Sequence, residues 1–233
     1  MKKNYSYIGI AAIILVFGII FIPKIVDRVQ SESIVEKDRM NIEGTERNTK
    51  LSYLKIDGKA RSVPDFLFTN QDNLEISNED FKGKVTVMEF FFTTCPTICP
   101  VMNSNMRVLD EEFHKRDDFA IASFTIDPET DTPKVLKEYA ERYGVQSLNW
   151  HFLTGDMEDI HQLSNTGFNI FTGINPEVAG GFEHQGFFAL IDKNGFIRSR
   201  QDNHGNPKVY YQGTDEAEIK MLQQDIQNLL DEE

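Results

Sequence analysis

The sequence predicts an α/β fold in which helices cover both faces of a mixed central sheet, preceded by one N-terminal transmembrane helix. Three observations lead to this prediction. From Leu51 onward, apolar runs typical of strands alternate with amphipathic helical patterns. A strand pair around Asn194-Gly195 then precedes a last helical pattern. An uncharged apolar run from Tyr5 to Ile22 is about as long as a helix that crosses a bilayer.

A buried central strand is expected at residues 85–92, which are rich in β-branched and aromatic side chains. The helix that follows carries a single apolar stripe, because its apolar residues recur at steps of four, three and four. The stripe consists of Met102, Met106, Leu109 and Phe113. We interpret the two methionines as core residues and not as thioether ligands of a metal.

Strands and helices continue to alternate downstream. The expected elements are a strand at 119–126, a helix from Thr132-Pro133 to the residue before Gly144, a strand at 150–153, a helix at 156–167, a looser segment at 168–185, and an antiparallel pair at 186–191 and 196–200. A closing helix is expected from Thr214, with Ile219, Leu222, Ile226 and Leu229 at helical spacing. This order is typical of a thioredoxin-like fold, with residues 51–81 as an N-terminal extension.

The chain is expected to have three parts: a membrane anchor at residues 1–23, a polar tether at 24–50 and a globular domain at 51–233. The flank after the apolar run offers no small-x-small cleavage site and no lipid-accepting cysteine, which favours an anchor over a cleaved secretory signal. Lys2 and Lys3 precede the run, so the domain is expected outside the cytoplasm. No Arg-rich transit peptide precedes the run. We therefore predict a single-pass protein of the bacterial inner (cytoplasmic) membrane with its soluble domain on the periplasmic or extracytoplasmic side.

The charge of the chain excludes one class of partner. The formal net charge is −13, and removing residues 1–28 leaves 20 basic and 36 acidic residues, a charge of −16. Such a domain is not expected to bind nucleic acid. We interpret the acidity mainly as a source of solubility, with a docking face for a basic partner as the alternative.

Cys95 and Cys99 are the only cysteines, and they lie where the most apolar strand meets a helix. Side chains at positions i and i+4 near a helix start share one face, with Cβ atoms about 5 to 6 Å apart. A helix N-terminus also stabilises thiolate over thiol. The pair can therefore bind one metal ion or act as a redox pair. A purely structural disulfide is the alternative, although closing so short a loop stabilises little.

His184 is the third candidate. Three residues separate the cysteines instead of the two found in thioredoxins, and His184 occupies the neighbourhood where thioredoxins carry a cis-proline. Two thiolates and one imidazole form a soft set that selects Cu(I), whereas zinc usually takes a fourth ligand. A lone histidine is more often an ordinary surface or core residue, so that reading stays open. His114, His151, His161 and His204 share no spacing with the cysteines and are interpreted as ordinary.

Two segments, residues 91–100 (Phe-Phe-Thr-Thr-Cys-Pro-Thr-Ile-Cys-Pro) and 125–133 (Thr-Ile-Asp-Pro-Glu-Thr-Asp-Thr-Pro), resemble the Sco/SenC family of copper chaperones. The likeness covers roughly residues 64–230. It implies that Cys95, Cys99 and His184 bind copper, expected as Cu(I), which makes 51–233 a copper-binding domain. It also implies a loop-shaping role for Asp127. Thr97, Glu183 and Gln185 depart from the residues of many relatives but leave the ligand set intact.

The resemblance implies a membrane-anchored copper metallochaperone that delivers copper to the binuclear copper site in subunit II of cytochrome c oxidase. Two alternatives remain: a thiol-disulfide oxidoreductase that reduces the oxidase cysteines, and a redox or copper sensor. The same cysteines serve all three roles, so whether the protein is an enzyme stays open. Gly173, Gly180 and Gly181 flank the histidine, and we hypothesise that His184 swings in and out during transfer. The upstream copper donor is unknown.

Overall fold

The computed structural model of the chain describes residues 15–19, 21–22, 51–56, 58–201 and 206–232. The chain divides into two compact units, Met1–Arg47 and Asn48–Glu233. The described residues of the first unit are helical, while most of the expected anchor and the whole expected tether lie outside the described residues. No helix in the described part of the chain has both the length and the apolar character needed to cross a bilayer.

The second unit is built on a nine-stranded mixed sheet. Along the sheet the strands lie in the order β1-β12-β11-β6-β7-β8-β4-β5, and β13 pairs with β11. Their bounds are β1 Ser52–Tyr53, β4 Leu67–Asn70, β5 Glu75–Ser77, β6 Val85–Phe91, β7 Phe119–Thr125, β8 Trp150–Thr154, β11 Phe187–Ile191, β12 Ile197–Ser199 and β13 Tyr211–Gln212. Short ribbons form apart from it, from β2 Lys55–Ile56 with β3 Lys59–Ala60 and from β9 Thr172–Ile174 with β10 Phe182–His184.

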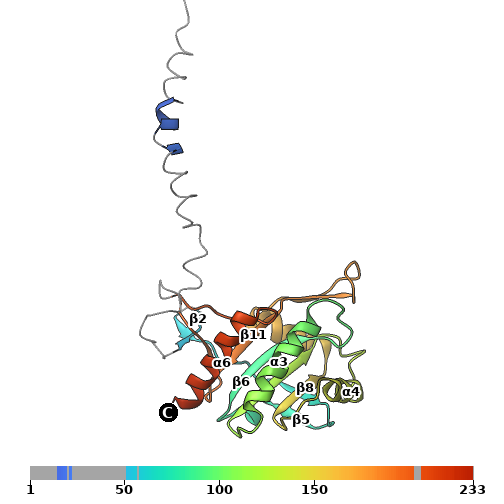
Figure 1. Cartoon of the computed structure of the whole chain (residues 1–233). Helices are drawn as coiled ribbons and strands as arrows, with labels where there is room; N and C mark the ends of the chain where they lie inside the picture. The colour runs from blue at the N-terminus through green and yellow to red at the C-terminus, as the bar shows by residue number, and fades with distance from the viewer. Residues whose placement is uncertain (1–14, 20, 23–50, 57, 202–205, 233) are drawn as a thin grey trace, which may run out of the picture. The chain divides into compact units, whose positions relative to one another are not determined.

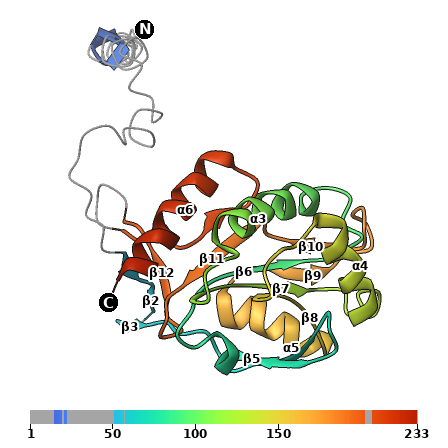
Figure 2. The same cartoon turned by 60° about the horizontal axis from the view of Figure 1, so that its bottom comes forward.

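Helices cover both faces of this sheet, as predicted. The helices are α3 Cys99–Phe113, α4 Pro133–Tyr143, α5 Met157–Gln162 and α6 Glu216–Asp231, with a short 3-10 helix at Asn78–Phe81. Figure 2 shows α3, α4 and α6 on one side of the sheet and α5 on the other. The central strands β6 and β7 run parallel and are buried at every residue. Strands covered on both faces need continuous apolar runs, which explains the composition of residues 85–92.

The sequence patterns place α3 and α4 correctly. The four stripe residues of α3 are buried, so both methionines lie in the core. Helix α4 starts with Pro133 in its first turn and ends at Gly144, whose φ of 66° is the left-handed conformation that closes many helices. Helix α6 begins two residues later than predicted, because the side chain of Asp215, and not that of Thr214, accepts the hydrogen bonds of the first free amides.

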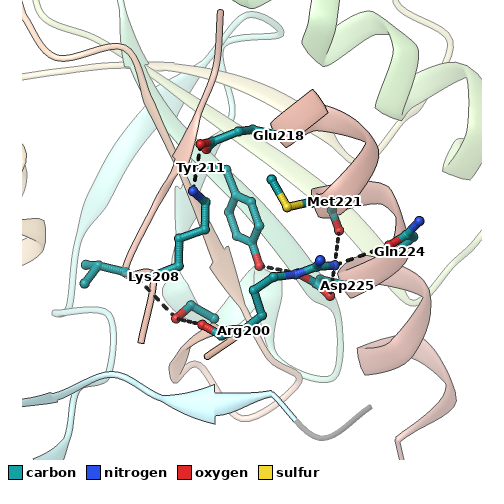
Figure 3. Close-up of polar contacts among 9 residues, drawn as sticks. Arg200, Lys208, Tyr211, Glu218, Met221, Gln224 and Asp225 are labelled. Carbon is teal, nitrogen blue, oxygen red and sulfur yellow. Dashed lines mark hydrogen bonds and ion pairs between the residues drawn. The ribbon is translucent and has the colours of Figure 1, made fainter. Parts of the chain in front are cut away.

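Helix α6, drawn in red in Figure 1, is joined to the segments beside it by a partly buried polar cluster, which Figure 3 shows. The Asp225 carboxylate accepts two hydrogen bonds from the Arg200 guanidinium, at 2.7 and 2.8 Å, and one from the Tyr211 hydroxyl at 2.7 Å. Nearby, Lys208 Nζ lies 2.7 Å from Glu218 Oε1. Planar pairing of this kind gives a helix one defined position. The cluster joins α6 to β13 and to Arg200 and Lys208, which lie between β12 and β13, and it contains neither cysteine.

Three segments differ from the prediction. The helix expected at 156–167 is α5 followed by a π-helix at Leu163–Phe168. The looser segment expected at 168–185 contains the β9–β10 hairpin, in which Thr172 pairs with His184. These strands have three residues each, with a glycine in one of them, so they lack the alternation that reveals longer strands. The expected N-terminal extension also contributes β4, which pairs with β8 inside the main sheet.

Candidate metal centre

The three predicted ligands meet at one end of the sheet. Cys99 Sγ lies 3.2 Å and Cys95 Sγ lies 4.0 Å from His184 Nε2. All three ligand atoms lie within 4.8 Å of one another. Within the described ranges, they form the one group of three or more His, Cys, Asp or Glu side chains close enough to hold a metal ion. His184 lies 89 positions after Cys95 and 85 positions after Cys99 in the chain, and the fold brings the three residues together in a single candidate site.

Both cysteines are held by the junction between β6 and α3. The backbone N–H of Cys95 donates to the Phe92 carbonyl at 3.3 Å, which folds the chain back after the strand. Cys99 is the first residue of α3, and Pro100 follows it inside the first turn, where a missing amide hydrogen costs nothing. The cysteines are buried, with 7% and 1% of their surfaces exposed, and they are not joined by a disulfide.

A buried carboxylate supports the loop that carries Cys95. Asp131 accepts hydrogen bonds from the Thr93 amide, at 3.0 Å, and from the Thr93 and Thr125 hydroxyls. Asp127, which the motif singled out as the loop-shaping residue, accepts from the Thr130 amide within its own turn. Asp131 therefore connects the cysteine loop to the segment before α4, a contact that the spacing of the motif could not reveal.

The two thiols have opposite electrostatic environments. A hydrogen bond from Cys99 lowers the pKa of the Cys95 thiol to about 3, with further help from His184 and Thr97 and against the effect of burial. The same hydrogen bond and burial raise the pKa of Cys99. Thr97 Oγ1 lies 3.5 Å from Cys95 Sγ. The reduced pair therefore holds one thiolate, on Cys95, and one buried thiol, on Cys99.

The imidazole of His184 is oriented by packing. Its ring meets the ring of Phe92 edge-on, with centroids 5.7 Å apart, and Phe92 also contacts Phe182 on the same hairpin. Its Nδ1 atom is buried and has no hydrogen-bond partner among the residues that the structure describes. Metal-bound histidines usually donate a second hydrogen bond that fixes the ring, so this site depends on where the strand places His184.

The sequence patterns did not single out Glu89, a buried glutamate on the strand that leads to the cysteines. Glu89 lies in the middle of β6 with no exposed surface, and Ser123 donates to its Oε1 atom at 2.7 Å. Trp150 Nε1 donates in turn to the Ser123 hydroxyl at 3.0 Å. Burial raises the pKa of Glu89 to about 7. The signal was available, because an acidic residue inside an apolar central strand is rarely buried without a reason.

The other histidines that the structure describes, His114, His151 and His161, make their polar contacts outside the group of three ligand atoms. His114 contacts carbonyls at the end of α3, and His151 contacts Asn70 and the ring of Phe81. His161 lies 2.9 Å from the Thr172 hydroxyl. His204 lies outside the described residues.

Comparisons with known proteins agree with this geometry. The pattern of the family described as SCO1/SenC matches residues 55–217. A relative described as "SCO1 protein homolog" from Bacillus subtilis strain 168 is 38% identical over 137 residues, which cover 58% of this chain and 70% of that protein.

Two solved structures share the fold. A SCO1/SenC family lipoprotein from Bacillus anthracis str. Ames is 32% identical with a TM-score of 0.64, and the match covers 73% of this chain and 96% of that one. BsSco, described with a disulfide switch and as a member of the Sco family of cytochrome c oxidase assembly proteins, is 31% identical with a TM-score of 0.62. That match covers 74% of this chain and 95% of that one. The predicted mixed α/β, thioredoxin-like fold is therefore confirmed for the domain, and the chain belongs to the SCO1/SenC family.

Proposed function

We propose that Cys95, Cys99 and His184 bind one copper ion as Cu(I), and that the protein delivers it to cytochrome c oxidase. The observation that carries the proposal is the convergence of two sulfurs and one imidazole nitrogen within 4.8 Å. Thiolates select Cu(I), and a set of three ligands is too small for the usual four-coordinate zinc site.

The protonation state of the pair suits capture of a soft cation. Cys95 supplies a thiolate before copper arrives, so the first Cu–S bond forms without loss of a proton. Binding through Cys99 then releases one proton, because its sulfur is held as a thiol in the copper-free pair. The imidazole of His184 completes a three-coordinate site. A partner thiolate can replace these ligands one at a time, which transfers the ion without releasing it into water.

The recipient that we propose is the binuclear copper site in subunit II of the oxidase. The support comes from family membership and from BsSco, which is described as belonging to a family of oxidase assembly proteins. We further propose that residues 1–23 anchor the chain in the bacterial inner membrane and that residues 24–50 act as a tether. The domain at 51–233 then acts on the extracytoplasmic side.

A second candidate function uses the same cysteines as a reductant. The Cys95 thiolate attacks a partner disulfide and forms a mixed disulfide, and Cys99, after losing its proton, attacks Cys95. The products are a Cys95–Cys99 disulfide and a reduced partner dithiol, so two electrons pass to the partner. Two features favour this candidate: the cysteines are not joined by a disulfide, and the pKa is lowered for Cys95 but raised for Cys99. A sensor that binds copper or changes redox state without transfer uses the same chemistry.

Competition with a colorimetric Cu(I) chelator, under anaerobic conditions, tests the copper site. The reduced full-length chain in detergent is compared with its His184→Ala variant. We expect one Cu(I) per chain and an affinity that falls at least about ten-fold without the imidazole. Binding that is indifferent to His184 would contradict the three-ligand site and favour the thiol-disulfide enzyme.

A further inference from the structure

The strand that carries His184, β10, pairs with β9, and β9 is in turn held by the side chain of Asn165. Thr172 lies on β9 directly opposite His184, and only 2% of its surface is exposed. The Asn165 side chain binds both backbone polar groups of Thr172. Its Oδ1 accepts from the Thr172 amide at 3.0 Å and its Nδ2 donates to the Thr172 carbonyl at 2.9 Å. Asn165 thus pairs with β9 as another strand would.

This contact determines how Thr172 and His184 face each other. Because both polar groups of Thr172 point toward Asn165, they point away from β10. The two residues therefore form a non-hydrogen-bonded pair, the arrangement in which facing Cα atoms are only about 4.5 Å apart and the side chains lie closest. The next pair along the hairpin agrees with this arrangement, because hydrogen-bonded and non-hydrogen-bonded pairs alternate and the Gln185 amide donates to the Phe171 carbonyl at 3.1 Å. The Thr172 side chain consequently stands beside that of His184 on one face of the hairpin.

The Thr172 side chain is itself held. Its hydroxyl lies 2.9 Å from His161 Nδ1 on α5 and 3.4 Å from Asn165 Nδ2. We call Asn165, Thr172 and His161 the Thr172 clamp. It connects β9, the strand that pairs with the His184 strand β10, to α5 and to the π-helix.

The π-helix that positions Asn165 is anchored at several points. The Arg61 guanidinium donates to the Gly167 carbonyl at 2.8 Å and also to that of Thr166. The Tyr210 hydroxyl donates to the Phe168 carbonyl. π-helical segments are rare and often occur at functional positions. Here the wider turn carries the one side chain that pairs with β9.

We propose that Asn165 and Thr172 are positioning residues for the metal ligand His184, holding the strand from which its imidazole reaches the thiols. This inference rests on the proposed copper site. The swinging histidine stays a hypothesis, and this inference bears on it because His184 lies at the base of the hairpin, opposite Thr172. The tip is held by its own turn, in which the Asn175 amide donates to the Gly181 carbonyl at 2.8 Å.

A double-mutant cycle with His184→Ala tests the clamp. Cu(I) affinity is measured for the reduced full-length chain carrying Asn165→Ala or Thr172→Val, each alone and combined with His184→Ala. Each single substitution is expected to lower the affinity about ten-fold, as loss of a supporting residue usually does. In the His184→Ala background neither should have a further effect, because residues that act through one group are not additive.

Matched variants separate positioning from general damage. Thr172→Ser keeps the hydroxyl and should retain the parent affinity. Asn175→Ala removes the hydrogen bond from Asn175 Nδ2 to Glu183 at the hairpin tip and should also be neutral. Circular dichroism confirms folding, and if Asn165→Ala does not fold, the comparison of Thr172→Val with Thr172→Ser replaces it.

Two results would overturn the clamp. One is an equal loss of affinity with and without His184, which indicates general destabilisation. The other is an unchanged affinity in Asn165→Ala and Thr172→Val while His184→Ala binds weakly. If His184→Ala itself binds Cu(I) like the parent, the copper site and the clamp both fail, and that result is distinct from the other two.

Discussion

The carboxyl group of Glu89 lies where a negative charge is costly. It is fully buried, its Oε2 atom has no partner in the described part of the chain, and burial raises its pKa from 4.5 to about 7. In the unfolded chain the group ionises near its ordinary value. Between the two values the folded protein keeps a proton that the unfolded chain has lost, so stability falls as the pH rises.

This difference predicts the pH dependence of Glu89→Gln. The parent should lose about 3 kcal/mol of unfolding free energy, relative to the variant, as the pH rises from about 4.5 to about 7, and little more above that. Urea unfolding of both proteins across this range measures the difference. Glu75→Gln, on an exposed position of β5, is the control for loss of a carboxylate. A constant difference between parent and Glu89→Gln would show that the pKa of Glu89 is the same in the folded and unfolded states, which contradicts the raised value.

The low pKa of Cys95 predicts its reactivity. In the reduced protein, alkylation of Cys95 by iodoacetamide should be nearly independent of pH from about 5 to 8, because the sulfur is already a thiolate. Cys99 should react much more slowly, since its pKa is raised and only 1% of its surface is exposed, against 7% for Cys95. Peptide mass spectrometry gives both rates separately.

The cause of the low pKa can be tested in the same assay. The hydrogen bond from Cys99 is its largest contribution, so Cys99→Ala should move the alkylation midpoint of Cys95 upward, toward the ordinary thiol value of about 8.5. A rate for parent Cys95 that rises ten-fold per pH unit up to that value would contradict the thiolate assignment.

At the scale of the element, the β9–β10 hairpin touches the cysteine loop through Gly180. A Cβ atom at this residue would lie 2.9 Å from the Phe92 ring and 3.2 Å from Pro96, whereas one at Gly181 would meet nothing within 4 Å. Both glycines have positive φ angles, of 91° and 80°. The pair therefore offers one substitution with a clash and one without it, at similar backbone cost.

Gly180→Ala and Gly181→Ala should differ in copper binding. Each is expected to lose about 1 kcal/mol of unfolding free energy from its backbone conformation. Only Gly180→Ala also displaces Phe92, whose ring packs against His184, so only this variant should bind Cu(I) more weakly. Chelator competition and urea unfolding measure the two effects separately. Equal Cu(I) affinities would show that the hairpin tip does not influence the site.

The elements that the sequence predicted well are those with long, regular patterns. The apolar stripe of α3 and the capping residues of α4 are local signals, read within one or two turns. The hairpin that carries His184 has no such signal. Its strands are short, and its position depends on Asn165, which pairs with β9 only because a π-helix turns it there. A contact of this kind is set by tertiary packing and leaves no periodicity in the sequence.

For the whole molecule, the candidate site shows what a motif can and cannot reveal. The spacing of Cys95 and Cys99 predicted a shared face, and His184 was one candidate among open alternatives until the resemblance singled it out as a ligand. The motif did not reveal which carboxylate supports the site. The resemblance gave the loop-shaping role to Asp127, whereas in the structure the cysteine loop donates its hydrogen bonds to Asp131. Asp131 reaches Thr93 across 38 positions of sequence, and such long-range hydrogen bonds depend on how two loops meet in the fold.

The two compact units predict that binding and membrane attachment can be separated. The apolar run from Tyr5 to Ile22 falls in the first unit, and every candidate ligand falls in the second. A chain that begins at Asn48 should therefore be released from membranes and keep the Cu(I) affinity of the full chain. The full chain should stay with the membrane after a carbonate wash, because an uncharged run of this length favours insertion.

Ile14→Lys, which adds about 3 kcal/mol to the insertion free energy, should weaken attachment without changing Cu(I) affinity. Recovery of the Asn48 chain in washed membranes would assign attachment to the domain itself, and a mature protein that starts after residue 23 would show that the segment is a cleaved signal.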